Sequence, residues 1–182
     1  MKKLLIVVDM QADFISGALG TPEAQAIVPN VVKKIAGFDG DVVYTRDTHG
    51  EDYLQTAEGK KLPVVHCVRE TSGWEIHPEV YEAGQGKTVA VIDKPTFGSV
   101  ELGAFAVAGG YNAIELVGLC TDICVISNAL YLKANLWETP IAVCKDCCAG
   151  VTPDSHHNAL NAMTMCQIDI DRKSTRLNSS HD

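Results

Sequence analysis

The sequence predicts a single α/β domain: a three-layer, doubly wound, mostly parallel β-sheet with helices on both faces. Three observations support this class. Short runs rich in β-branched residues alternate with segments of helical apolar spacing. Several runs are apolar throughout, as expected for strands that are buried on both faces. The length of 182 residues suits one domain, and no internal repeat or linker interrupts it.

The first elements follow from local patterns. Residues 4–8 form a continuous apolar run, which predicts the first strand. Residues 22–35 carry apolar side chains at helical spacing, and Thr21 with Pro22 supplies an N-cap and a first turn. Residues 41–45 are predicted to form the second strand.

The rest of the chain begins with an irregular stretch and then becomes periodic again. Residues 46–86 are rich in charge, glycine, proline and histidine, which predicts a long functional excursion with short helical turns. Three further strands are predicted at 87–92, 112–117 and 141–144, alternating with helices at 100–108, 121–136 and 153–166. Thr121 or Asp122 is expected near the N-cap of the second of these helices, and a sixth short strand near 166–170.

Composition and charge exclude several functional classes. The net charge of -8 disfavours nucleic acid as a partner. Seven cysteines are an odd number, and no signal peptide precedes the first strand, so we expect reduced thiols instead of a disulfide framework. The apolar run at 4–8 is too short to span a bilayer. We therefore expect a cytoplasmic protein with no membrane partner.

The last residues do not fit the pattern of the domain. Residues 171–182 are polar, have no apolar period, and resemble the in-frame translation of a sequencing adapter. We interpret 1–170 as the domain and 171–182 as a non-native tail, with a genuine frayed terminus as the alternative.

Three chemically active residues lie at the carboxyl ends of predicted strands, where functional groups gather in such sheets. Asp9 ends the first strand, Lys94 follows the third, and Cys124 comes just after the fourth. A thiol in the first turn of a helix is favoured as thiolate, an ammonium would lower its pKa further, and a carboxylate could accept its proton. Backbone N–H groups at the same helix start could hold an oxyanion.

Each of these residues also has an ordinary structural explanation. A cysteine in an apolar stretch is often a small buried hydrophobe, Asp9 could cap a turn, and most lysines are solvated. The common placement of Asp9, Lys94 and Cys124 at one edge favours the catalytic interpretation.

Three segments in order resemble the nicotinamidase and isochorismatase-like cysteine hydrolases, on the nicotinamidase-like branch. They are the motif at 9–14 (DMQADF), the lysine segment at 94–99 (KPTFGS) and the nucleophile turn at 118–125 (GLCTDICV). The resemblance covers nearly all of residues 3–170 and implies the isochorismatase-like hydrolase fold. It also implies that members assemble into homo-oligomers, so we expect one here.

The resemblance implies a role for each residue. Asp9 would be the general base, Lys94 would orient and acidify the thiol, and Cys124 would be the nucleophile. A cis peptide bond at Leu119–Cys120 would direct the backbone N–H groups of Cys120 and Cys124 at the oxyanion. Cys120 departs from the alanine that is common in the family, but only its backbone is needed.

A metal site is predicted above the same edge of the sheet. Asp47 and His49 follow the second strand and His66 comes later, a set that can hold a divalent ion with open positions. The resemblance to the nicotinamidase metal site supports this set and adds Glu58 as the fourth ligand, with Tyr53 and Asp52 as rivals. Zinc is expected, and iron or manganese would suit the same ligands. A solvated turn is the alternative.

The predicted metal site narrows the range of possible substrates. In nicotinamidases, the resemblance implies, the ion binds the pyridine nitrogen and sets the carboxamide over the thiol. Phe14 would pack against the ring, and Trp74 and Phe97 are weaker candidates. Residues 62–66 (LPVVH) depart from the family pattern, because they lack an aromatic residue and contain one extra residue.

The predicted function is therefore cysteine-dependent hydrolysis of nicotinamide to nicotinate and ammonia, which would serve pyridine nucleotide salvage. Three alternatives stay open: a related hydrolase of another small amide or an enol ether, a non-catalytic binding module, and a thiol redox protein using Cys120, Cys147 and Cys148. The last is the weakest, because adjacent cysteines bond to each other only with strain.

Overall fold

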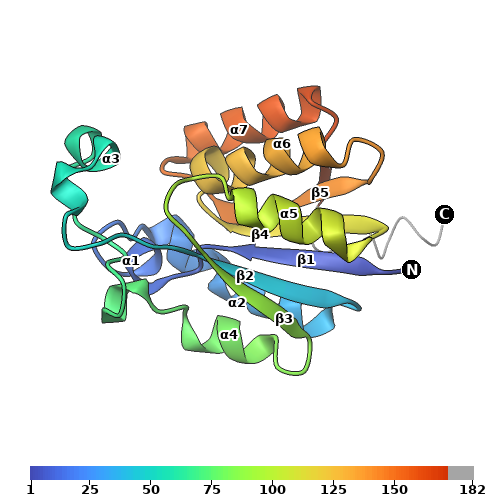
Figure 1. Cartoon of the computed structure of the whole chain (residues 1–182), viewed down its shortest axis with the longest axis horizontal. Helices are drawn as coiled ribbons and strands as arrows, with labels where there is room; N and C mark the ends of the chain where they lie inside the picture. The colour runs from blue at the N-terminus through green and yellow to red at the C-terminus, as the bar shows by residue number, and fades with distance from the viewer. Residues whose placement is uncertain (172–182) are drawn as a thin grey trace.

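A computed structural model describes residues 1–171 (Figure 1). The predicted non-native tail, 171–182, lies outside these residues except for Asp171. The six strands of the described chain form one sheet in the order β3-β2-β1-β4-β5-β6, and every pairing is parallel. Their bounds are β1 Lys3–Val8, β2 Asp41–Asp47, β3 Thr88–Lys94, β4 Ala113–Leu119, β5 Ile141–Ala149 and β6 Asp169–Asp171. The predicted doubly wound sheet is confirmed.

Helices cover both faces of this sheet (Figure 1). On one face lie α2 (Pro22–Gly37) and α4 (Pro78–Ala83), and on the other α5 (Val100–Gly109), α6 (Ile126–Asn135) and α7 (Pro153–Met165). The central strand β1 is buried on both sides: Leu4, Ile6 and Val8 belong to one apolar core and Leu5 and Val7 to the other. This double burial explains why the run at 4–8 is apolar without alternation.

Helix starts follow their capping residues. Thr21 accepts a hydrogen bond from the backbone N–H of Ala24 and so caps α2, as the sequence predicted. Thr152 and Ser155 form a reciprocal capping box at the start of α7. Thr121 and Asp122 lie near the helix start, as expected, but neither is the N-cap. The chain first forms a π-helical turn, η3 (Thr121–Val125), whose N-cap is Cys120.

Two further elements differ from the prediction. Strand β5 extends to Ala149 instead of ending at residue 144, since an irregularity in its pairing with β4 accommodates the polar residues Lys145 and Asp146. A short helix, α1 (Ala12–Ile15), was not predicted. The excursion at 46–86 contains the expected short turns: η1 (Tyr53–Gln55), α3 (Ala57–Lys61), η2 (Ser72–Trp74) and α4. No helix among residues 1–171 is long and apolar enough to cross a membrane.

The carboxyl end of α2 is closed by a side chain from outside the helix. Lys87 Nζ donates to the backbone carbonyls of Ile35, Ala36 and Phe38 at 2.7, 2.8 and 2.9 Å. A cation at this position satisfies free carbonyls and complements the helix dipole. We expect Lys87→Met to lower the free energy of unfolding by about 1–3 kcal/mol.

Urea denaturation compares this variant with Lys33→Met, which removes an exposed lysine from the same helix and should cost less than about 0.5 kcal/mol. Equal losses in the two variants would show that the Lys87 cap does not stabilise α2.

Candidate functional site

The strand order reverses between β1 and β4, and in doubly wound sheets ligands bind at this point, beyond the carboxyl ends of the strands. Asp9 directly follows β1, and Asp47 and Lys94 are the last residues of β2 and β3. Cys124 lies in η3, the turn that follows β4. The parallel register brings these four residues to one edge, although they are remote in sequence.

Lys94 joins the other two predicted catalytic residues. Its Nζ atom lies 2.6 Å from Asp9 Oδ2 and 3.3 Å from Cys124 Sγ. Asp9 is 0% exposed, Lys94 1% and Cys124 5%, so all three meet in a dry environment. The other carboxylate oxygen of Asp9 accepts a 2.7 Å hydrogen bond from Thr45 Oγ1. Asp9 has a positive φ of 50°, a backbone conformation that aspartate tolerates better than most residues.

The electrostatics of this group differ from the prediction in one respect. Burial and the charge of Asp9 raise the pKa of the Cys124 thiol well above its ordinary value, and Lys94 only opposes this shift. The predicted lowering of the thiol pKa is therefore wrong. Burial also raises the pKa of Asp9 against the influence of Lys94. The raised thiol pKa means that Cys124 must lose its proton to a neighbouring base before it can attack.

The backbone around Cys124 is held from two sides. Gly118 has a φ of 122°, and a Cβ there would overlap the carbonyl of Val8 on the neighbouring strand. Asn128, one turn after Cys124, donates from Nδ2 to the carbonyl of Cys124 at 2.8 Å and accepts from the N–H of Ser99 at 2.8 Å. The peptide bond between Leu119 and Cys120 is cis, as the resemblance implied. The oxyanion role of the backbone N–H groups of Cys120 and Cys124 stays a prediction.

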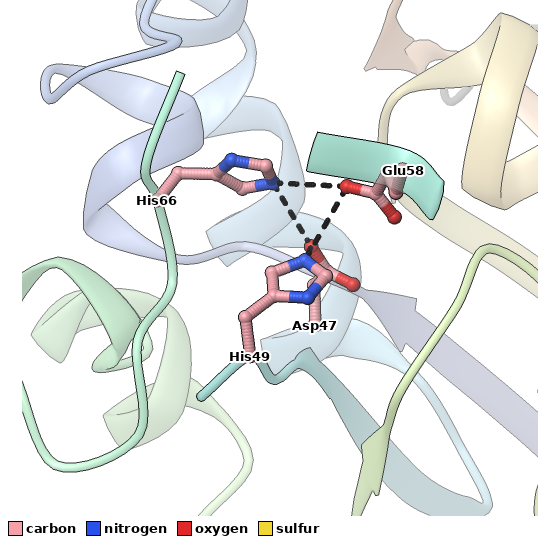
Figure 2. A group of neighbouring side chains, drawn as sticks. All are labelled: Asp47, His49, Glu58 and His66. Carbon is pink, nitrogen blue, oxygen red and sulfur yellow. Dashed lines mark hydrogen bonds and ion pairs between the residues drawn. The ribbon is translucent and has the colours of Figure 1, made fainter. Parts of the chain in front are cut away.

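The four predicted metal ligands come together in space (Figure 2). Asp47, His49, Glu58 and His66 each offer one ligand atom, and these atoms all lie within 4.8 Å of one another. Asp47 Oδ2 is 2.9 Å from His49 Nε2 and 3.3 Å from His66 Nε2. Glu58 Oε2 lies 3.4 and 3.6 Å from the same two nitrogens. Two imidazoles and two carboxylates of this kind suit zinc, iron or manganese.

Two features show that this set fits a cation. Asp47 Oδ1 is buried and accepts no hydrogen bond from the described residues, and Lys94 Nζ is 3.8 Å away. His66 Nδ1 lies 2.7 Å from the carbonyl of Val64, which can only accept, so the lone pair of neutral His66 is on Nε2, facing the carboxylates. Burial would raise the pKa of Asp47, but hydrogen bonds from His49 and His66 hold it below its ordinary value.

The rivals for the fourth ligand have other contacts. The single O–H of Tyr53 points between two acceptors, Glu58 Oε2 at 3.1 Å and the carbonyl of Leu62 at 2.8 Å, and so helps to orient Glu58. Asp52 is not part of the four-residue group. Glu58 lies on α3, in the segment that extends beyond the carboxyl ends of the strands (Figure 1).

A pocket of about 210 Å³ lies beside Cys124 and the metal ligands. Its lining includes the nucleophile and three of the four ligands, and most of the rest is apolar. The full lining is Phe14, Leu19, Thr21, Ala24, Asp47, Glu58, Leu62, His66, Phe97, Leu119, Cys120, Ile123, Cys124, Gly150 and Val151. Phe14 packs on His66 with 5.5 Å between ring centroids.

Some aromatic and histidine side chains lie elsewhere. Trp74 does not line the pocket; it stacks on Arg46, 3.8 Å from ring centroid to guanidinium. His77 caps α4 and is not part of the metal-binding group. His156 and His157, which are adjacent in α7, are not part of it either. His156 is half-buried and hydrogen-bonded to Thr121.

All seven cysteines are free thiols. Cys120 lines the pocket, and burial raises its thiol pKa to about 12. Cys124 is the better candidate nucleophile, because its Sγ lies 3.3 Å from Lys94 Nζ, which can stabilise the sulfur anion. Cys144 and Cys147 form a Cys-x-x-Cys pair that the sequence argument against a redox protein overlooked. Both are fully buried in the core beneath α2, where exchange with another thiol is blocked.

Comparison with known proteins gives consistent similarities. The isochorismatase domain model matches residues 3–173. A nicotinamidase of Saccharomyces cerevisiae is 22% identical over 183 residues, covering 76% of this chain and 85% of that protein. The nicotinamidase/pyrazinamidase structure from Bacillus subtilis is 26% identical with a TM-score of 0.81, covering 94% and 100% of the two chains. The pyrazinamidase of Pyrococcus horikoshii in complex with zinc is 28% identical with a TM-score of 0.79, covering 94% and 99%.

Proposed function

The chain belongs to the isochorismatase family and is an amidohydrolase, and from this premise we propose that it hydrolyses nicotinamide to nicotinate and ammonia. In this proposal Cys124 is the nucleophile and a divalent ion, zinc, is the cofactor. One observation carries the proposal: a single small pocket is lined both by Cys124 and by Asp47, Glu58 and His66. A substrate held at the ligands therefore lies next to the thiol. Solved relatives of similar fold include a pyrazinamidase with zinc.

The first half-reaction uses the buried residues Asp9, Lys94 and Cys124. Asp9 accepts the thiol proton while Cys124 Sγ attacks the carboxamide carbon. Lys94, 3.3 Å from Sγ, stabilises the sulfur anion as it forms. The backbone N–H groups of Cys120 and Cys124 would donate to the oxyanion. Asp9 then passes its proton to the amide nitrogen, the C–N bond breaks, and ammonia leaves a thioester on Cys124.

The second half-reaction reverses the proton path. Asp9 accepts a proton from water, whose oxygen attacks the thioester carbonyl, and this proton returns to Sγ as the C–S bond breaks. The released nicotinic acid then loses its carboxyl proton to solvent and becomes nicotinate. Phe14 provides an apolar wall for the ring. A divalent ion bound by Asp47, His49, Glu58 and His66 would supply a Lewis acid for the pyridine nitrogen and so orient the carboxamide.

Chelation tests the metal requirement and the substrate together. We expect ammonia release from nicotinamide by the purified protein to fall at least about 100-fold after chelation, because the ring loses its anchor. Added Zn²⁺, Mn²⁺ or Fe²⁺ should restore it. The metal content of the same samples should change in parallel with the rate of ammonia release. Absence of nicotinamide turnover by the metal-loaded protein would refute the proposed substrate.

A second candidate is hydrolysis of another small amide or of an enol ether. The apolar pocket mouth favours it, since Leu62, Phe97 and Val151 are exposed at the rim and could contact a larger apolar substituent. Residues 62–66 are also where the chain departs from the family pattern. Turnover of such compounds without turnover of nicotinamide would favour this candidate.

A further inference from the structure

Among the described residues, the polar groups of Gln11 and Asp13 form no hydrogen bond with the four ligand side chains. Both side chains instead bind the backbone near three of the ligands, Asp47, His49 and His66. We call this pair the 11–13 clasp. It belongs to the segment that follows β1 and supplies Asp9. Gln11 is fully buried and Asp13 is half-buried.

The Gln11 amide holds Asp47 from both sides of its backbone. Its Oε1 accepts from the N–H of Asp47 at 2.8 Å, and its Nε2 donates to the carbonyl of Asp47 at 2.8 Å. The same Nε2 donates to the carbonyl of Trp74 at 2.9 Å. Trp74 Nε1 in turn donates to Thr48 Oγ1 at 2.9 Å. Gln11 thus fixes the end of β2 at the first ligand, in the way that a neighbouring strand would.

The Asp13 carboxylate holds the segment of the two histidines. Its Oδ2 accepts from the N–H of Cys67 at 2.8 Å, directly after His66. The carbonyl of Cys67 accepts from the N–H of His49 at 2.9 Å, so the backbone of one residue, Cys67, connects Asp13 to the segments of both histidine ligands. Gly73 permits this approach, because a Cβ there would overlap the carboxylate of Asp13.

We propose that Gln11 and Asp13 are positioning residues for the metal centre: they hold Asp47, His49 and His66 in the geometry that binds the ion, without binding it themselves. The inference rests on the metal-dependent part of the proposed function. Glu58 lies outside the clasp, because the hydrogen bond that orients its carboxylate comes from Tyr53. Loss of groups that orient metal ligands typically costs about 10–100-fold in metal affinity.

Zinc affinity of the metal-free full-length protein, measured by competition with a chromophoric chelator, tests the clasp without any substrate. Gln11→Met and Asp13→Ala should each weaken Zn²⁺ binding by about 10–100-fold. Asp13→Asn should bind within about threefold of the parent, because its amide oxygen can still accept from the N–H of Cys67. This rescue separates positioning from bulk packing.

Tyr111→Phe is the matched control. It removes a 2.8 Å hydrogen bond to Asp41 at the opposite end of β2 and should leave Zn²⁺ affinity within about twofold, whatever its effect on Tm. Far-UV circular dichroism identifies the folded variants. If Gln11→Met does not fold, the comparison of Asp13→Ala with Asp13→Asn still tests the positioning role.

Unchanged affinity in folded Asp13→Ala, an equal loss in Asp13→Asn, or a parent that binds no Zn²⁺ would overturn the proposal. Tight Zn²⁺ binding that the clasp variants weaken, together with no turnover of nicotinamide, would support the clasp and refute only the proposed substrate.

Discussion

Cys124→Ala will release no measurable ammonia from nicotinamide, a loss of at least about 10⁴-fold, because the group that forms the covalent bond to the substrate is absent. The side chain is small and 5% exposed, so its removal leaves a modest cavity and a folded protein. Initial rates of ammonia release, compared at equal metal content, measure this effect.

Cys124→Ser is the matched control, since it keeps the size of the side chain and replaces the thiol with a much weaker nucleophile at neutral pH. Both variants should bind Zn²⁺ like the parent, because Cys124 is not among the four ligands. A Cys124→Ala variant with the activity of the parent would revive the non-catalytic binding module or move catalysis to another residue.

Asp9→Asn should reduce turnover by about 10²–10⁴-fold, because the amide cannot accept the thiol proton. Burial raises the pKa of the Cys124 thiol, so a neighbouring base is needed to form the thiolate. The substitution also leaves Lys94 without the carboxylate that lies 2.6 Å away, so we expect a stability loss of about 3–5 kcal/mol. Steady-state kinetics and urea denaturation measure the two effects separately.

A double variant separates chemistry from stability. Lys94→Met in the Asp9→Asn background removes the uncompensated charge and should recover much of the lost stability, while turnover stays abolished. Asp9 is not the base if Asp9→Asn keeps more than about a tenth of the activity, or if the double variant regains turnover together with stability.

The sheet and the edge that holds the site could be predicted from the sequence because burial leaves a direct pattern. The apolar run at 4–8 marks a strand buried on both faces, and parallel strands place their carboxyl ends together. That rule alone grouped Asp9, Lys94 and Cys124. In the structure, Lys94 contacts both Asp9 and Cys124. The family resemblance was needed for Glu58, whose helix α3 has no periodic signal.

What the sequence did not reveal depends on contacts between distant residues. The sign of the Cys124 pKa shift follows from near-complete burial beside Asp9, which outweighs Lys94 and has no local signature. Because Asn128 lies one helical turn after Cys124, the sequence alone could have suggested a contact between them. The hydrogen bond between Asn128 and the distant Ser99 could not have been predicted in this way. The second half of β5 was not predicted, because polar residues at an irregularity in the strand interrupt its apolar run.

The central claim is that the sulfur of residue 124 becomes acylated during turnover. Acid quenching of the metal-loaded enzyme during steady-state reaction with nicotinamide, followed by peptide mass spectrometry, tests it directly. We expect a nicotinoyl thioester on the peptide that contains Cys124, absent from the Cys124→Ala protein. A nicotinoyl group on Cys120 or another residue, or a fully unmodified Cys124 when thioester hydrolysis is shown to limit the rate, would contradict it.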